Sequence, residues 1–430
     1  MSDFLEILAS RRRFGMRPGL DVMRALCAAI GNPHEKFKAI HVAGTNGKGA
    51  VCAFLSAALS SLDNTARVCR YTSPHLVKIN ERFVIDALPA SDEALAKCAN
   101  IVQGAIKSSV GKAGSGAELE ETTFFEALTA MAYLLFADIE PDYAILECGL
   151  GGRLDATNIC SSELSIITKI GLDHCDWLGG SIESIAAEKA GIIKSGVPVV
   201  LAKNDEAVKS VVAARARALG SPFYYAPDIA NESELPSCLP LGGAFNRENA
   251  VTALAALRVL SKLGRVGQVN LHSCFANARW PGRFDRVGCF LMDGAHNPPA
   301  AEALSAALRE KFPGLKLPLV AGFCADKDAQ AVLTTLAPLV SKGFAVKTNN
   351  QRSLSAQDVA SVMEISGIPS EPCASLAEAM EKSREGVSDS VPTLVTGSLF
   401  LVGEALNLLL ATSLGGTSSV IDPSELLRGT

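Results

Sequence analysis

A glycine-rich turn that ends in a lysine carries the clearest chemical signal in this sequence. It lies in residues 37–62, FKAIHVAGTNGKGAVCAFLSAALSSL, between an apolar segment typical of a buried strand and one typical of a helix. Gly44 and Gly47 let the backbone fold closely around an anion, the first N–H groups of the helix point towards it, and Lys48 adds a positive charge. The arrangement predicts a phosphate-binding loop, with ATP or GTP as the anion.

The turn departs from the strict P-loop pattern at two positions. Val42 stands where the pattern has its first glycine, and Gly49 follows Lys48 where the pattern has Ser or Thr. The turn alone therefore fits a structural role as well as it fits nucleotide binding, and the residues around it must decide.

Polar side chains follow the next two predicted strands. Glu147 ends DYAILE, and Asp173 and His174 follow SIITKIG. A carboxylate at the carboxyl end of a parallel strand can hold Mg²⁺ on a nucleotide, and a neighbouring imidazole or carboxylate can complete the site. A single histidine at a strand end more often makes a structural hydrogen bond, but three polar groups at neighbouring ends favour a metal site.

Lys189 lies in the predicted helix segment EKAGIIK. A lysine there normally forms an ion pair, because its ordinary pKa lies about three units above neutrality. Other cations close by would make the amine neutral and reactive. Spacing alone favours the ion pair.

A second group of polar residues follows strands in the last third of the chain. Asp293 and His296 follow CFLM, Asp326 and Lys327 follow LPLVAGFC, and Ser398 follows TLVTG. Each could be an ordinary cap or turn residue, but three such groups together predict a second wall of functional side chains.

The elements that must position these residues alternate between strand and helix. Apolar runs at ARVCRYT, DYAILECG, LSIITKIG and VPVVLA are separated by helical segments such as residues 124–138. This alternation predicts an α/β fold with a mostly parallel, doubly wound sheet. A second alternating series follows the turn-rich segment RWPGRFDR, so we predict one domain over residues 1–287 and a smaller α/β domain over residues 288–430.

Composition narrows the functional classes. The 430 residues, 48% of them hydrophobic, can bury two cores. A net charge of −5 argues against an extended nucleic-acid surface. The run Arg11–Arg13 precedes no apolar signal region, and no apolar stretch is long enough for a membrane span, so we expect a soluble, cytoplasmic protein. The twelve cysteines include no C-x-x-C pair, which indicates reduced thiols rather than disulfides or a zinc site.

Taken in order, the motifs of nearly the whole chain resemble folylpolyglutamate synthase and dihydrofolate synthase, the folate branch of the Mur ligase family. The segments that carry the resemblance are RPGLDVMRALCAAIGNP, IHVAGTNGKG, YTSPHLVKINER, TTFFEALTAMA, ILECGLGGRLDATN, ITKIGLDHCDWLG, IAAEKAGIIK, WPGRFDRV, DGAHNP, ADKD and VTGSLFLVGE. The resemblance implies an ATP-dependent amide ligase. It has a P-loop-type N-terminal ATPase domain with a folate pocket and a C-terminal Rossmann-like glutamate ligase domain.

The resemblance also implies a mechanism. ATP phosphorylates a carboxylate of dihydropteroate or of a folyl-glutamate, and the amine of L-glutamate attacks the acyl phosphate, with phosphate as the leaving group. Positioning and electrostatics supply most of the catalysis in such reactions. The same chemistry adds the first glutamate and later ones, so the sequence leaves both open. The partners are then small molecules, without nucleic acid or membrane, and a two-domain ligase of this kind is expected to be a monomer.

Roles for individual residues follow from the resemblance. Lys48 neutralises the transferred phosphoryl group, and Lys189 matches the carbamylated lysine of the family. The positions that match Mg²⁺ ligands are Ser73, Glu147 and His174. The nucleotide positions are Gly44, Thr45, Asn46, Gly47, Lys48, Gly49, Asn249, Arg283 and Asp293. The substrate positions are Phe124 in the folate pocket, Asp293, His296, and Ser398, which would contact L-glutamate. The catalytic positions are Lys48, Lys189, His174 and His296.

Three departures from the family pattern leave two other functions open. Ala50 stands where Ser or Thr is usual, Phe245 and Asn246 replace His and Gln, and Pro299 replaces a His. One alternative is a cell-wall Mur-type ligase, against which Gly49 and SPHLVKINER argue. The other is a degenerate ATP-binding protein with a regulatory role.

Overall fold

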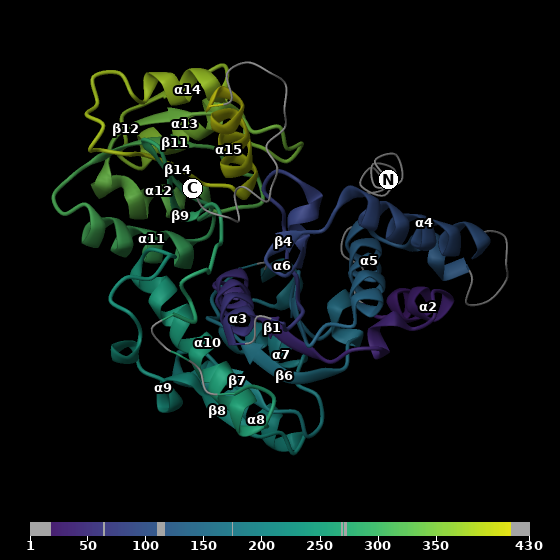
Figure 1. Ribbon diagram of the computed structural model, residues 1–430. Helices are drawn as coiled ribbons and strands as arrows, with labels where there is room; N and C mark the ends of the chain where they lie inside the picture. The colour runs from purple at the N-terminus through teal and green to yellow at the C-terminus, as the bar shows by residue number, and fades with distance from the viewer. Residues whose placement is uncertain are drawn as a thin grey trace. The chain divides into compact units, whose positions relative to one another are not determined.

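The computed structural model describes residues 19–62, 65–109, 117–173, 175–267, 270 and 273–413. The chain forms two compact units (Figure 1). Unit 1 comprises the chain up to Pro74, Asn80–Ser237 and Glu248–Ala278, and unit 2 comprises His75–Ile79, Cys238–Arg247 and the chain from Arg279 onwards.

Unit 1 is built on an eight-stranded sheet with the order β4-β3-β2-β5-β1-β6-β7-β8. The five pairs β2–β5, β5–β1, β1–β6, β6–β7 and β7–β8 are parallel, and the pairs β2–β3 and β3–β4 are antiparallel. The prediction of a mostly parallel sheet is thus confirmed. The strands are β1 (Ala39–Ala43), β2 (Val68–Tyr71), β3 (Phe83–Ile85), β4 (Leu88–Pro89), β5 (Tyr143–Glu147), β6 (Ser162–Ile167), β7 (Val199–Leu201) and β8 (Phe223–Tyr225).

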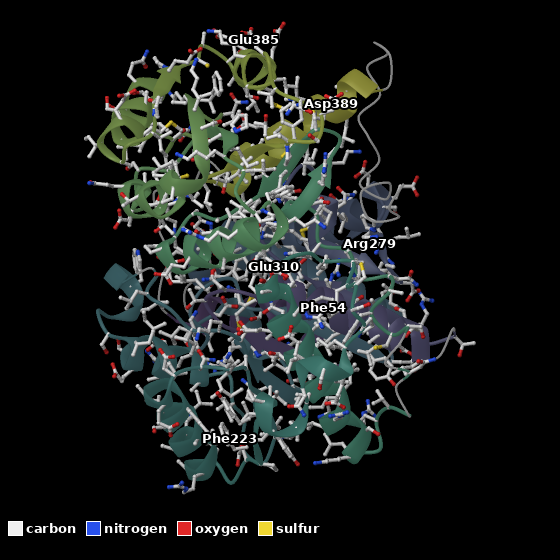
Figure 2. The ribbon with its side chains drawn as sticks, turned by 90° about the vertical axis from the view of Figure 1, so that its left-hand side faces the viewer. Phe54, Phe223, Arg279, Glu310, Glu385 and Asp389 are labelled. Atoms are coloured by element: carbon white, nitrogen blue, oxygen red, sulfur yellow. The ribbon has the colours of Figure 1, made fainter. Side chains whose placement is uncertain are left out.

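The helices of unit 1 bury apolar faces against this sheet. On α3, for example, Phe54 is fully buried (labelled in Figure 2). Its ring also meets that of Phe275 edge-on, with the ring centroids 5.0 Å apart. The helices are α2 (Asp21–Ala29), α3 (Lys48–Leu62), α4 (Asp92–Ser109), α5 (Phe124–Ile139), α6 (Cys175–Leu178), α7 (Ile182–Ala190), α8 (Glu206–Ala218) and α9 (Ala226–Ile229). Helix α10 (Ala244–Lys262) begins in unit 2 and continues into unit 1. Short 3₁₀ turns are η1 (Pro33–Glu35), η2 (Ile79–Arg82), η3 (Ala117–Glu121), η4 (Ala156–Ile159) and η5 (Glu232–Glu234).

Unit 2 has its own six-stranded sheet, ordered β13-β12-β11-β14-β10-β9, in which only β9 is antiparallel. Its core includes Leu401 and Val402, against which Leu76 packs. The strands are β9 (Arg283–Val287), β10 (Phe290–Asp293), β11 (Leu317–Ala321), β12 (Val340–Ala345), β13 (Ser370–Pro372) and β14 (Thr393–Thr396). The helices are α11 (Pro298–Lys311), α12 (Ala329–Leu336), α13 (Ala356–Ile365), α14 (Leu376–Lys382) and α15 (Leu399–Ser413), with the 3₁₀ turn η6 (Ala337–Leu339).

The two units divide the chain differently from the boundary predicted at residue 287. That boundary falls at the end of β9, which pairs with β10 and so belongs to the sheet of unit 2. The final stretch of unit 2 therefore begins at Arg279. The segment predicted to be turn-rich instead contributes an edge strand.

Two expectations about the whole chain can be compared with the described residues. Each cysteine whose side chain is described is a free thiol, and most are buried, as predicted. Within the described part of the chain, no helix combines the length and the hydropathy needed to cross a membrane.

The capping box of α13 offers a test of local stability away from the candidate site. Ser355 Oγ accepts the N–H of Asp358 at 3.1 Å and donates to its carboxylate at 2.7 Å. We expect Ser355→Ala to lower the free energy of unfolding by about 1 kcal/mol, because the first turn loses an acceptor for its N–H groups. Urea denaturation followed by circular dichroism measures this. Ser355→Asp, which keeps an acceptor, is the control, and equal losses in both variants would contradict the assignment.

Candidate functional site

The glycine-rich turn joins β1 to α3 and can be built only with glycine at two positions. The φ angles of Gly44 and Gly47 are 154° and 87°. A Cβ atom on Gly44 would lie 1.8 Å from Thr168 Oγ1, and one on Gly47 would lie 2.2 Å from Asn249 Oδ1. The backbone thus approaches both side chains more closely than any other residue type allows. Asn249, on α10, therefore lies beside the loop.

Hydrogen bonds to the end of β6 hold the loop in shape. The N–H groups of Thr45 and Asn46 both donate to Lys169 O, at 2.9 and 3.1 Å. Thr168 Oγ1 donates to Asn46 O at 2.7 Å, and Thr45 Oγ1 donates to Gly171 O at 3.1 Å. These contacts connect neighbouring parallel strands at their carboxyl ends, so the loop is fixed by the sheet itself.

Two lysine side chains converge on one carbonyl oxygen of this loop. Lys48 Nζ donates to Gly44 O at 3.1 Å and to Thr45 O at 3.2 Å, while Lys189 Nζ, from the end of α7, donates to Gly44 O at 2.8 Å. Lys189 is only 4% exposed. Burial and, next, the charge of Lys48 lower the pKa of Lys189 to about 7. The ion pair that the spacing favoured for Lys189 is wrong, since its Nζ donates to a backbone carbonyl.

Glu147 ends β5 beside the segment that follows β2. It is 3% exposed, and its Oε2 accepts the N–H of Ser73 at 2.9 Å, so two of the three predicted metal positions are adjacent. The third, His174, lies outside the described residues. Among the described residues, no group of three or more His, Cys, Asp and Glu side chains is placed to hold a metal ion.

Two buried arginines accompany Glu147, and the sequence prediction missed both. Burial lowers the pKa of Arg70 and of Arg82, and the charge of Glu147 partly offsets this in each. Arg82 also stands over the ring of Phe124 at the start of α5, with its Cζ 5.9 Å from the ring centroid. The signal available in the sequence was a charged residue within the otherwise apolar run VCRY and another in INER.

A buried hydrogen-bond network connects β1, the strand before the loop, to the segment that follows β5. His41 Nε2 lies 2.8 Å from Thr157 Oγ1 and 3.1 Å from Cys148 Sγ, and Thr157 donates to Asp155 at 2.5 Å. Asp155 also accepts the N–H of Leu150 at 2.8 Å. Burial lowers the pKa of His41 to about 3, so this imidazole is neutral and structural. The network fixes the chain directly after Glu147.

In unit 2 the predicted residues gather at the carboxyl ends of two adjacent parallel strands. Asp293, at the end of β10, accepts the N–H groups of Phe284 and Ala295 at 2.8 and 2.9 Å. Burial raises its pKa, and the charge of Arg283 opposes that shift. His296 Nδ1 lies 2.8 Å from Gly294 O.

Ser398 follows β14, the strand beside β10, and its Oγ accepts the N–H of Phe400 at 3.2 Å. The positions that depart from the family pattern have structural partners. Phe245 meets Phe284 at 90° with centroids 6.3 Å apart, and Asn246 donates to Gly242 O at 2.8 Å. Pro299 lies in the first turn of α11, where proline is well tolerated.

Comparison with known proteins identifies the family. The Mur ligase glutamate ligase domain matches residues 282–399. The dihydrofolate synthase/folylpolyglutamate synthase of Bacillus subtilis strain 168 is 34% identical over 420 residues, covering 92% of this chain and 95% of the relative. This chain belongs to the dihydrofolate synthase/folylpolyglutamate synthase family. The family predicted from the motifs is therefore confirmed.

Solved structures of the family share the fold of the whole chain. Escherichia coli FolC in complex with DHPP and ADP gives a TM-score of 0.82 at 28% identity, covering 96% of this chain and 98% of that one. The Yersinia pestis folylpolyglutamate synthase/dihydrofolate synthase complexed with AMPPNP and a Mn ion also gives 0.82, at 29% identity, covering 95% and 98%. The two-domain α/β architecture is confirmed, and relatives bind adenine nucleotides and a divalent metal.

The position of Lys189 predicts an unusual titration. We expect its amine to lose its proton with a midpoint near pH 7, because burial and the Lys48 charge both disfavour the ammonium form. NMR of protein labelled at the lysine ε-carbon measures this, with the signal assigned by its loss in Lys189→Arg. Lys48→Met should raise the midpoint without restoring the ordinary value of 10.5, since burial is the larger cause. A midpoint unchanged by Lys48→Met would contradict the coupling.

Proposed function

We propose that this protein uses ATP and Mg²⁺ to join L-glutamate to dihydropteroate, to a folyl-(poly)glutamate, or to both. The observation that carries the proposal is the rigid glycine loop with two lysines on one carbonyl, in a chain 34% identical to a dihydrofolate synthase/folylpolyglutamate synthase. The loop and α3 supply N–H groups and a helix N-terminus for the phosphates of ATP. The cell-wall alternative has no such support, because the relatives compared carry folate names.

The reaction needs a carboxylate to become a good electrophile. An oxygen of the folate carboxylate attacks the γ-phosphorus, the bond to the β-phosphate oxygen breaks, and ADP leaves. The amine of L-glutamate then attacks the acyl carbon and loses a proton, and inorganic phosphate leaves. In this scheme Lys48 neutralises the transferred phosphoryl, and the fixed loop holds it in line, so most of the rate enhancement comes from positioning and charge.

The residues around Glu147 fit a divalent metal. Mg²⁺ prefers oxygen ligands, and the hydrogen bond from Ser73 N to Glu147 places a residue with a hydroxyl group next to the carboxylate. We propose that Glu147 and Ser73, with His174, hold Mg²⁺, which neutralises charge on the ATP phosphates. Ala50 provides no hydroxyl in the first turn of α3, so these groups carry the whole metal site.

Lys189 fits a carbamate. A neutral amine attacks CO₂, forming an N–C bond and releasing a proton, and the product is an anion. The depressed pKa of Lys189 supplies the neutral amine, and the cation Lys48 nearby favours the anion that results. We propose that Lys189 is carbamylated and that its carboxylate orients the metal or the phosphoryl group.

The remaining residues receive roles by the same proposal. Phe124 stacks on the flat pterin ring of the substrate. Arg82, which lies over the ring of Phe124, adds a positive charge beside this pocket. Arg283 and Asp293 contact the nucleotide, as does Asn249 on the loop side. His296 contacts both the nucleotide and the substrate, and Ser398 contacts L-glutamate. We further propose that the protein acts as a cytoplasmic monomer, in which unit 1 provides the ATPase and folate pocket and unit 2 the glutamate ligase domain.

Phosphate release tests the function. We expect the purified protein with Mg²⁺, ATP and L-glutamate to release phosphate when dihydropteroate or tetrahydrofolate is added, and mass spectrometry to show a product one glutamate longer. Lys48→Ala should lower kcat at least about a hundredfold, because a phosphoryl-stabilising charge is lost. Lys107→Ala, an exposed lysine on α4, is the control and should not change it.

The pattern of release separates the remaining readings. Turnover with dihydropteroate alone identifies a dihydrofolate synthase, turnover with tetrahydrofolate alone a folylpolyglutamate synthase, and turnover with both a bifunctional enzyme. ATP binding without turnover on either substrate would contradict the proposal and favour the degenerate protein. Ala50→Ser is then the variant that tests whether the missing hydroxyl is responsible.

Carbamylation has a separate readout. We expect ¹³C-bicarbonate to give a carbamate signal in the wild-type protein that is absent in Lys189→Arg, with a large loss of turnover in that variant. The signal should weaken as the pH falls below about 7, because protonation removes the nucleophilic amine. Full activity of Lys189→Arg, or a signal that persists in it, would contradict the proposal.

A further inference from the structure

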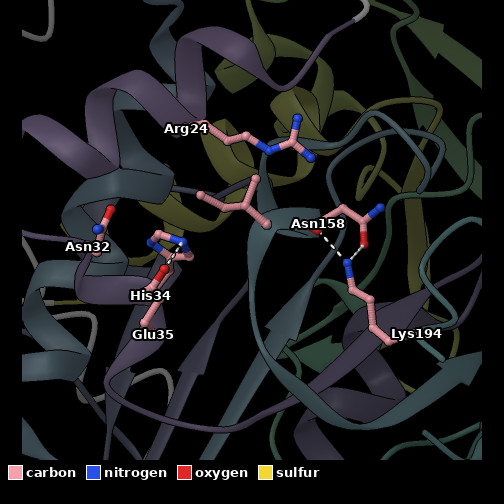
Figure 3. Close-up of a pocket in the computed structure, with 7 residues that line it drawn as sticks. Arg24, Asn32, His34, Glu35, Asn158 and Lys194 are labelled. Atoms are coloured by element: carbon pink, nitrogen blue, oxygen red, sulfur yellow. Dashed lines mark hydrogen bonds and ion pairs between the residues drawn. The ribbon is translucent and has the colours of Figure 1, made fainter. Parts of the chain in front are cut away.

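A cavity of about 380 Å³ lies in unit 1 (Figure 3). Its size falls within the roughly 300–1,000 Å³ typical of small-molecule sites. Asn32, His34 and Glu35 line one side of it, and Asn158 and Lys194 line the other, with Arg24 from α2. None of these residues has a role in the proposed glutamate ligation.

The sequence positions of these residues place the cavity at the opposite edge of the sheet from the phosphate loop. His34 and Glu35 precede β1, Asn158 precedes β6, and Lys194 precedes β7. Because β1, β6 and β7 are parallel, these residues meet at the amino ends of the strands. The phosphate loop follows the carboxyl end of β1, so the two sites are separated by the length of the strands.

Two cationic side chains face this cavity. Lys194 Nζ donates to Asn158 O at 2.5 Å and to Asn158 Oδ1 at 2.7 Å, which leaves one of its three N–H groups for a ligand. Arg24 pairs with Asp21, 3.6 Å away on the same exposed helix face. Burial lowers the pKa of Lys194, and the charge of Arg24 adds to the effect, so the two cations repel each other across the cavity. An anion between them would relieve that repulsion.

His34 adds a buried polar atom that lacks a partner. It is 9% exposed, and its Nδ1 has no hydrogen-bond partner in the described structure. Burial lowers the pKa of His34, with the charge of Glu35 opposing, so the imidazole is neutral and carries one N–H. An unsatisfied buried nitrogen is unusual in folded proteins. This nitrogen is closed off from solvent, and the other ring nitrogen, Nε2, lies 3.8 Å from Glu35 Oε1, so His34 shapes the cavity wall without contacting a ligand.

The floor of the cavity is already fixed by hydrogen bonds. Asn158 Nδ2 donates to Arg153 O at 2.9 Å and to Gly191 O at 3.1 Å, in addition to the two bonds that Asn158 accepts from Lys194. Lys194 is therefore already held in place, and ligand binding costs little free energy for ordering the floor of the cavity.

We propose that this cavity binds the oxyanion group of a small molecule, a phosphate or a carboxylate, through Arg24 and Lys194. Glu35 is the only carboxylate among its lining residues and limits the affinity by repulsion. The site is distinct from the phosphate loop and does not depend on the glutamate ligase activity.

Equilibrium dialysis of the full chain with labelled inorganic phosphate, or with labelled malonate as the carboxylate probe, tests the proposal. Excess AMPPNP and Mg²⁺ occupy the phosphate loop in both arms. We expect saturable binding of one or both probes. Arg24→Ala should weaken it at least about tenfold, since a charge-assisted hydrogen bond is lost, and Glu35→Gln should strengthen it.

Matched controls keep the outcome decisive. Arg215→Ala removes an equal charge from the exposed face of α8 and should leave binding unchanged. Lys194→Met should weaken binding as well, with circular dichroism showing that the variant folds. Absence of saturable binding of both probes would overturn the proposal. So would binding that neither Arg24→Ala nor Glu35→Gln alters, because the anion would then be bound elsewhere.

Discussion

The candidate site depends on one backbone carbonyl, Gly44 O, that accepts hydrogen bonds from both Lys48 and Lys189. Two ammonium groups this close repel each other, and one of them is buried, so the arrangement favours a neutral Lys189 beside a charged Lys48. It exists only because β1, α3 and α7 meet at this turn, and because a glycine there lets Thr168 approach its Cα directly. The chemistry proposed for Lys189 thus follows from the packing of secondary structure.

The polar network behind the loop extends this constraint to Glu147, the proposed metal ligand. His41, in the middle of β1, contacts both Thr157 and Cys148, so the central strand is tied to the segment that follows Glu147. Glu147 in turn accepts the N–H of Ser73, which follows β2. Three neighbouring parallel strands, β2, β5 and β1, therefore position the carboxylate and the phosphate loop as one unit. A neutral, buried imidazole serves this purpose well, because it has no charge to desolvate.

How much of this could be predicted depends on whether the signal is local in the sequence. The phosphate loop can be predicted from the strand-turn-helix pattern of one segment. The position of Glu147 at the carboxyl end of a strand can likewise be predicted from the single segment DYAILE. The burial of Lys189 and the placement of Arg82 beside Glu147 depend on chain segments far apart in the sequence, so spacing predicted an ion pair for the first and missed the second. The boundary at residue 287 failed to include β9 in unit 2 for the same reason, since an antiparallel edge strand is defined by its partner β10.

Ala50 shows why a departure from a family pattern need not disturb a site. Three hydrogen bonds hold the loop to the end of β6. The N–H groups of Thr45 and Asn46 donate to the backbone there, and the Thr168 hydroxyl donates to Asn46 O. None of these bonds involves position 50, where the small side chain is buried in the first turn of α3. Loss of a hydroxyl there leaves the phosphate cradle intact and removes only a group that could have faced the metal. In the proposed mechanism the cost falls on metal affinity, and nucleotide binding by the loop is preserved.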